Sequence, residues 1–98
     1  MNLDLKDKLA LVSGSTKGIG LAIATSLADE GARVIVNGRR QESVAEALTK
    51  IRAQYPEAKL EGFWGDLSSS ATAAELVARF PSVDILVNNL GKIGRAHV

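Results

Sequence analysis

Apolar residues follow two patterns along the chain: short runs, and longer stretches in which they recur every three or four positions. The runs at 9–12, 33–37 and 83–87 are typical of strands buried on both faces of a sheet. Residues 59–64 alternate between apolar and polar and are also expected to form a strand. Because strands and helical stretches follow one another in strict alternation, the pattern predicts an α/β fold with a parallel sheet.

Three stretches between these strands have the period of an amphipathic helix. Their apolar stripes consist of Ile19, Ala22, Ile23 and Leu27; Val44, Ala47, Leu48 and Ile51; and Leu76, Val77 and Phe80. Gly31, Pro56 and Pro81 follow the three stripes, and glycine and proline are common where helices end. We therefore expect three helices that end shortly before these residues, the third capped by the serines at 68–70.

A glycine-rich turn joins the first predicted strand to the first predicted helix. It reads Ser13-Gly14-Ser15-Thr16-Lys17-Gly18-Ile19-Gly20 and lacks the Gly-Lys-Ser/Thr ending of a nucleoside-triphosphate loop. The first N–H groups of a helix have no partner within it and lie at the positive end of its dipole, which suits a pyrophosphate. We expect Gly14 to permit the tight turn, Gly18 to let phosphate approach the backbone, and Gly20 to let the helix pack closely on the strand.

With these elements placed, residues 5–91 resemble the short-chain dehydrogenase/reductase family. Three motifs carry the resemblance in the family's order: the turn at 13–20, Asp66-Leu67 after the third strand, and Asn88-Asn89-Leu90-Gly91 after the fourth. Ser13 keeps the hydroxyl of the family's usual threonine, whereas Leu90 replaces a small alanine. The resemblance implies a partial Rossmann fold, similar to that of NADPH-dependent 3-oxoacyl-ACP reductase-like members, within an enzyme that transfers hydride between nicotinamide and a carbonyl or alcohol.

The resemblance also implies a set of cofactor-binding residues at the matching positions. They are Gly14, Ser15, Thr16, Lys17, Gly18, Ile19 and Gly20 for the pyrophosphate, Asp66 and Leu67 for the adenine, and Asn89, Leu90 and Gly91 for the adjoining ribose. Two structural alternatives stay open, because Asp66 could instead cap the following helix and Asn88 could satisfy the backbone at the sheet edge.

The residues after the second strand indicate which dinucleotide is bound. An NAD enzyme tends to place an acid about 20 residues beyond the glycine turn, where it holds the ribose 2′-hydroxyl. That position is Gly38 here, and Arg39 and Arg40 follow it, with Lys17 inside the turn. Cations in this place suit a 2′-phosphate, so we expect NADP(H) to be favoured over NAD(H).

The resemblance places the catalytic serine and a Tyr-x-x-x-Lys pair on elements beyond the fourth strand, so no catalytic residue is assigned. Tyr55 and Lys59 have that spacing, but Tyr55 precedes a proline and Lys59 begins a predicted strand, which indicates a loop. We expect this chain to be the cofactor-binding part of a longer oxidoreductase and to be inactive by itself. The alternatives are a dinucleotide-binding module without catalysis and, less favoured, a methyltransferase, whose cofactor has no pyrophosphate.

Residues 1–91 are accordingly interpreted as the N-terminal part of an NAD(P)-binding Rossmann domain. Residues 93–98 show no hydrophobic period and no turn pattern. They match one reading frame of a common short-read sequencing adapter, so we expect residues 92–98 to be a non-native tail.

Composition narrows the classes of partner. The 98 residues contain 12 basic and 11 acidic side chains, scattered without a basic field, which argues against nucleic acid. With one histidine and no cysteine, the sequence predicts no metal site and no disulfide. No apolar run approaches the length of about 18 residues that a membrane span needs, so we expect a cytoplasmic protein. The parent enzyme is expected to act on a small molecule and to form a homo-oligomer.

Overall fold

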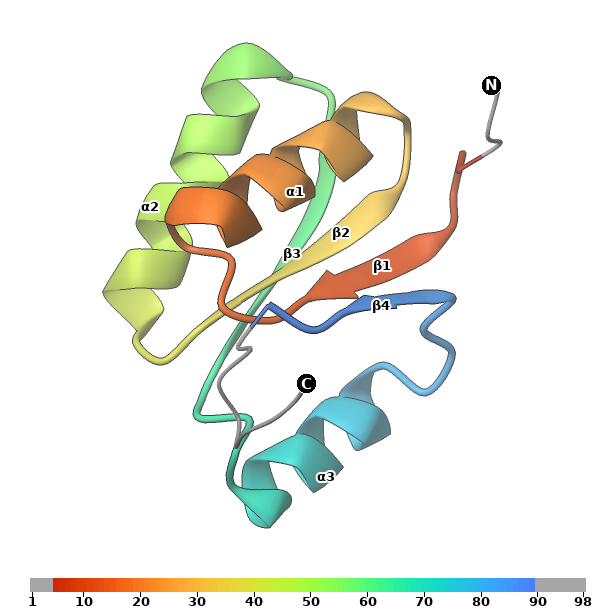
Figure 1. Ribbon diagram of the computed structural model, residues 1–98. Coiled ribbons are helices and arrows are strands. Elements are labelled where there is room, and N and C mark those ends of the chain that lie inside the picture. The colour runs from red at the N-terminus through yellow and green to blue at the C-terminus, as the bar shows by residue number, and fades with distance from the viewer. Residues whose placement is uncertain (1–4, 90–98) are drawn as a thin grey trace.

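The computed structural model describes residues 5–89, in which four parallel strands alternate with three helices (Figure 1). The elements in chain order are β1 (Leu9–Val12), α1 (Gly18–Asp29), β2 (Arg33–Gly38), α2 (Gln41–Gln54), β3 (Lys59–Trp64), α3 (Ser70–Arg79) and β4 (Ile85–Val87). The predicted α/β class, the parallel sheet and the order of the elements are confirmed.

The strand order is β3-β2-β1-β4. The chain therefore moves from β1 outward to β3 and then crosses back to the other side of β1. In the register, Leu11 lies beside Ile35 on one side and Leu86 on the other. Ligands of open α/β sheets bind where the strand order reverses, outside the carboxyl ends of the strands. Here that place is the edge where β1 and β4 end.

Alternate side chains of the strands build two cores, one on each face of the sheet. Val12, Val34 and Val36 pack with residues of α1 and α2 on one face. Leu11 and Phe63 pack with Leu76 of α3 on the other. Figure 1 shows the same arrangement, with α1 and α2 together on one side and α3 on the opposite side. Burial on both faces explains why the central strands are continuous apolar runs.

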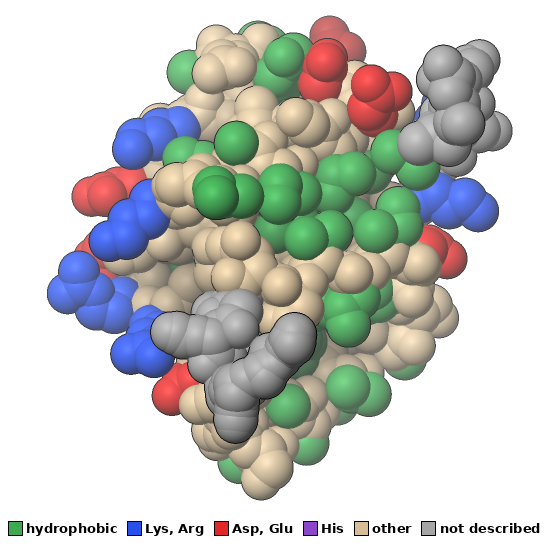
Figure 2. Space-filling view, viewed as in Figure 1, with side chains coloured by type: hydrophobic (Ala, Val, Ile, Leu, Met, Phe, Trp, Pro, Cys, Tyr) green, Lys and Arg blue, Asp and Glu red, His purple; other side chains and the backbone are tan. Residues whose placement is uncertain are grey.

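Helix α1 packs through small residues and not through the expected stripe. Its buried positions lie four apart and are Gly20, Ala24 and Ala28. Ile23 and Leu27 pack at the margin of the core, but Ala22 is exposed and Ile19 is 73% exposed, so these two assignments were wrong. Small residues let the helix axis approach the sheet closely, which turns the larger side chains outward. Figure 2 shows the resulting hydrophobic side chains along α1 on the viewed face.

The second helix follows the sequence pattern and the third departs from it. Val44, Ala47 and Ile51 of α2 are buried as predicted. Within residues 5–89, Leu76 is the one residue of α3 that is buried, and Val77 is 63% exposed. The reason is that α3 is the one helix of the described residues on its face of the sheet, so its stripe meets few neighbours.

The fourth strand begins later than predicted. Residues 83 and 84 precede it, and Asp84 instead fixes the start of the strand. Its backbone N–H donates to the carbonyl of Leu9 over 2.8 Å, and its carboxylate accepts a hydrogen bond from the backbone N–H of Leu9 over 2.9 Å. These bonds hold β4 in register with β1.

Candidate functional site

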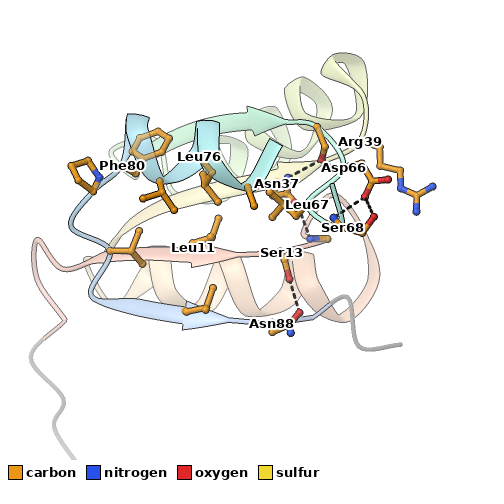
Figure 3. Close-up of a pocket in the computed structure, with 18 residues that line it drawn as sticks. Leu11, Ser13, Asn37, Arg39, Asp66, Leu67, Ser68, Leu76, Phe80 and Asn88 are labelled. Carbon is orange, nitrogen blue, oxygen red and sulfur yellow. Dashed lines mark hydrogen bonds between the residues drawn. The ribbon is translucent and has the colours of Figure 1, made fainter. Parts of the chain in front are cut away.

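A pocket of about 1160 Å³ opens on the α3 face of the sheet and reaches the carboxyl ends of the strands (Figure 3). Its polar part is lined by Ser13, Gly14, Asn37, Arg39, Asp66 and Asn88. Its apolar part is lined by Leu11, Leu76, Val77, Phe80, Val83 and Leu86. The pocket thus joins the place where the strand order reverses to an apolar groove under α3.

The glycine turn has the backbone that its sequence predicts. Gly14 and Gly18 have φ values of 56° and 63°, in the left-handed region where a side chain is strained. Gly20 has an ordinary backbone, but a Cβ there would collide with the carbonyl oxygen of Gly14 and lie 2.6 Å from the side-chain nitrogen of Asn89. The atoms nearest to such a Cβ therefore belong to the turn that follows β1 and to Asn89, the second residue after β4.

Ser15 holds the turn together and does not face the pocket. Its side chain is fully buried. Its hydroxyl donates to the carbonyl of Val12 over 2.7 Å and accepts from the backbone N–H of Asn37 over 2.9 Å. Its own backbone N–H donates to the carbonyl of Asn37 over 2.8 Å. The hydroxyl and the backbone N–H of Ser15 both donate to groups within the protein. Ser15 was predicted to contact the ligand, but its hydrogen bonds join β1 to β2.

Asn37 belongs to the site, although the sequence pattern did not predict it as a site residue. It is 2% exposed, and its side-chain oxygen accepts from the backbone N–H of Gly14 over 3.0 Å. Its side-chain nitrogen donates to the carbonyl of Phe63 over 3.1 Å. The same nitrogen lies 3.5 Å from the carbonyl oxygen of Gly65 (Figure 3). One amide thereby joins the ends of three strands. The available signal was a single polar residue at the end of an apolar strand, where burial requires partners.

The residues after β4 are bound to the same turn. The Ser13 hydroxyl accepts from the backbone N–H of Asn89 over 2.9 Å and donates toward the side-chain oxygen of Asn88 over 3.3 Å. The side-chain nitrogen of Asn89 donates to the carbonyl of Gly14 over 3.0 Å. The first and third motifs of the sequence therefore meet at one point of the sheet edge. Leu90, Gly91 and the tail at 92–98 lie outside the described residues.

Three cations were expected at the site, and one of them lines the pocket. Arg39 is exposed and contributes to the pocket wall directly after β2. Arg40 and Lys17 are also exposed, but they do not line the pocket. Arg40 immediately precedes α2, and Lys17 immediately precedes α1. Within residues 5–89 none of the three belongs to an ion pair.

Asp66 is exposed at the mouth of the pocket, where Ser68 orients it. One carboxylate oxygen accepts from the Ser68 hydroxyl over 2.6 Å and from the Ser68 backbone N–H over 2.9 Å (Figure 3). These two hydrogen bonds, with a smaller contribution from the charge of Arg39, hold the pKa of Asp66 below its ordinary value of 3.8. The N-cap of α3 is Ser69, so Asp66 lines the pocket without capping this helix. Leu67 lies beside it, half-buried, against the core under α3.

Tyr55 and Lys59 do not line the pocket. Tyr55 follows the last residue of α2, and Lys59 begins β3, at the end of the strand opposite to the site. Lys59 pairs with Asp7 across the surface. Among the described residues there is no cluster of three or more potential metal ligands. In the same part of the chain, no helix has both the length and the apolar content to cross a bilayer.

Comparison with known proteins places this geometry among oxidoreductases. The family model described as short chain dehydrogenase matches residues 8–98. An uncharacterized oxidoreductase of Bacillus subtilis, YvaG, is 53% identical over 91 residues, which cover 93% of this chain and 34% of that protein. The 3alpha-hydroxysteroid dehydrogenase of Mediterraneibacter gnavus is 40% identical, over 93% of this chain and 38% of its own length.

Solved structures agree with the sequence comparison. L-Sorbose reductase from Gluconobacter frateurii, complexed with NADPH and L-sorbose, matches with a TM-score of 0.78 at 28% identity, covering 100% of this chain and 38% of its own. The chain thus spans little more than a third of the length of the relatives that it matches.

Proposed function

We propose, because this chain belongs to the short-chain dehydrogenase/reductase family, that its pocket binds a nicotinamide dinucleotide and prefers NADP(H) to NAD(H). The end of β2 is the observation that carries this preference. Gly38 stands where an acid would hold the ribose 2′-hydroxyl of NAD, and Arg39 follows it in the pocket wall. A guanidinium at this place suits a 2′-phosphate, which it can bind through charge-assisted hydrogen bonds.

The start of α1 fits the pyrophosphate of such a ligand. Lys17 makes no side-chain cap and the first turn of α1 contains no acid, so neither of these two features neutralises the positive end of this helix. By contrast, α2 has Glu42 in its first turn and α3 is capped by Ser69. A Cβ on Gly18 would meet nothing within 4 Å, which leaves room for phosphate beside the backbone.

The remaining site residues would then hold the rest of the cofactor. Asp66 can accept a hydrogen bond from the amino group of adenine, with Leu67 as an apolar neighbour, and Asn89 would lie near the adjoining ribose. When bound, nicotinamide would supply or accept a hydride. We propose that the longer enzyme, acting on a small carbonyl or alcohol and assembled as a homo-oligomer, carries out that transfer, and that residues 5–89 bind the cofactor without catalysing.

Fluorescence titration tests the cofactor preference. Trp64 is the single tryptophan of the chain and is 49% exposed at the end of β3, so its emission can report a reduced nicotinamide cofactor. We expect NADPH to bind more tightly than NADH. Arg39→Ala should weaken NADPH binding about tenfold to a hundredfold, since a hydrogen bond to a charged group contributes about 1.5–3 kcal/mol.

The variant Arg52→Ala serves as the matched control. Arg52 lies in the last turn of α2, at the end of the helix opposite to Arg39, and should leave both affinities unchanged. NADH affinity should also be unchanged in Arg39→Ala. Equal affinity of the wild-type chain for NADPH and NADH would contradict the preference, and the absence of binding to either would contradict the proposed function.

A further inference from the structure

We infer that Thr16 and Gly38 form an interlocked pair that keeps any side chain off position 38, and that Thr16 thereby helps to determine the choice of cofactor. The inference rests on the proposed function, because position 38 is where an acid would bind the ribose of NAD. Gly38 is buried at the end of β2 and does not have a positive φ. Space, and not backbone conformation, therefore decides which residue can stand there.

That space is filled from two directions. A Cβ added to Gly38 would overlap the Cγ2 methyl of Thr16, which belongs to the glycine turn, and would lie 3.3 Å from a methyl of Val44 in α2. Rotating the threonine offers little relief, because a β-branched residue is restricted at χ1 and most of its rotamers keep a heavy atom on the same side. An aspartate at position 38 would have to begin where the Thr16 methyl lies.

Hydrogen bonds prevent the two segments from moving apart. Ser15 and Asn37, the residues just before Thr16 and Gly38, are joined by the two bonds of 2.8 and 2.9 Å described above. On the other edge of β2, the N–H of Gly65 donates to the carbonyl of Gly38 over 2.9 Å. Breaking a buried bond of this kind leaves a polar group without a partner, so the separation between Thr16 and Gly38 is fixed.

The consequence is that two positions must change together if the preference is to change. Gly38→Asp alone would displace the glycine turn and weaken the site for both dinucleotides. With Thr16→Ser, which removes the methyl and keeps the hydroxyl, the aspartate gains room and can bind a ribose 2′-hydroxyl. Thr16 thus acts as a specificity-determining residue through the neighbour that it excludes.

A double-mutant cycle on the full chain tests the packing without any ligand. We expect Gly38→Ala to raise the unfolding equilibrium constant about tenfold to a hundredfold, as overpacking does. In the Thr16→Ser background the same change should raise it less than about threefold. The constants come from urea denaturation. An equal effect of Gly38→Ala in the two backgrounds would overturn the inference.

Gly62 provides the matched control for this cycle. A Cβ there would lie 2.8 Å from a methyl of Val44 and 3.2 Å from one of Leu48, with no atom of Thr16 nearby. Gly62→Ala should therefore destabilise the chain to the same extent in both backgrounds. If Thr16→Ser rescued Gly62→Ala as well, the rescue would not be specific to the pair, and the inference would fail.

Affinity measurements with NADPH and NADH distinguish a failure of this inference from a failure of the proposed function. Relative to wild type, Thr16→Ser with Gly38→Asp should shift the ratio of NADPH to NADH affinity at least about tenfold toward NADH, whereas Gly38→Asp alone should lose affinity for both. A full switch by Gly38→Asp alone would overturn the role of Thr16. A wild-type chain that binds neither nucleotide would overturn the proposed function and the cofactor role of the pair, while the unfolding cycle would still decide the packing.

Discussion

A single buried amide, that of Asn37, holds together the strand ends on which the site depends. Its side-chain oxygen accepts from the backbone N–H of Gly14 in the glycine turn, and its side-chain nitrogen donates to the carbonyl of Phe63 in β3. The hydrophobic pattern could not have shown this, because it treats a polar residue at the end of a strand as the boundary of burial. The glycines were predictable from sequence, since a positive φ at Gly14 and Gly18 follows from local turn geometry.

Removing that amide should destabilise the chain. Asn37→Ala removes the acceptor of the Gly14 backbone N–H and a donor to the Phe63 carbonyl, and a buried polar group that loses its partner costs about 1–3 kcal/mol. We expect the free energy of unfolding, measured by urea denaturation, to fall by about 2–4 kcal/mol. Gln54→Ala removes an exposed amide at the end of α2 and should change it by less than about 0.5 kcal/mol. Similar losses in the two variants would contradict the role of Asn37.

The carboxyl group of Asp66 should show the effect of Ser68 in its titration. Because hydrogen bonds from Ser68 lower its pKa in the folded state, ionised Asp66 stabilises the fold above about pH 3.8, and this contribution is lost as the pH falls below that value. Ser68→Ala removes the largest of the causes and should raise the pKa of Asp66 toward its ordinary value. The measurement is an NMR titration of the Asp66 carboxyl carbon, and an unchanged pKa would show that Ser68 does not orient it.

At the scale of the elements, the bounds of strands and helices were largely predictable, whereas the faces of two helices were not. Periodicity locates an element because it depends on neighbours in sequence. Which face is buried depends on the partner: α1 approaches the sheet through Gly20, Ala24 and Ala28, so Ile19 points outward. The stripe of α3 is only partly covered for the same reason, since burial of Val77 requires an element beside it.

The start of α3 offers a test of local capping. The Ser69 hydroxyl accepts from the backbone N–H of Thr72 over 3.4 Å. Ser69→Ala should lower the free energy of unfolding by about 0.5–2 kcal/mol, the usual effect of losing an N-cap. Ser70→Ala, one residue further and exposed, removes a hydroxyl that does not cap the helix and is the control. The stabilities of both variants are compared by thermal denaturation. Equal midpoint temperatures for Ser69→Ala and Ser70→Ala would show that Ser69 contributes nothing as a cap.

At the scale of the whole molecule, the place of the site follows from the topology. Alternation of strands and helices predicts a parallel sheet, but the order β3-β2-β1-β4 cannot be read from periodicity, because it depends on pairing between distant segments. The order brings Gly14, Arg39, Asp66 and Asn88 to one pocket. Motifs that were separate in the sequence thereby become one candidate site.

The apolar part of the pocket should be detectable in solution. Leu86 is 67% exposed and Val77 is 63% exposed on the wall of the same groove. We expect the folded chain to enhance the fluorescence of the dye ANS, which binds exposed apolar surface. Leu86→Gln combined with Val77→Gln should remove most of the enhancement, whereas Ala45→Gln on the outer surface of α2 should leave it unchanged. Undiminished fluorescence in the double variant would place the apolar surface elsewhere.

We propose that the strand ends and the start of α1 bind NADP(H). The most direct measurement is an NMR titration of the ¹⁵N-labelled chain with NADPH. We predict that the amide signals of Gly14, Gly18, Arg39 and Asp66 shift together with increasing ligand, while that of Thr49, on the outer surface of α2, does not. Shifts confined to other parts of the chain, or none at any concentration of NADPH, would contradict the claim.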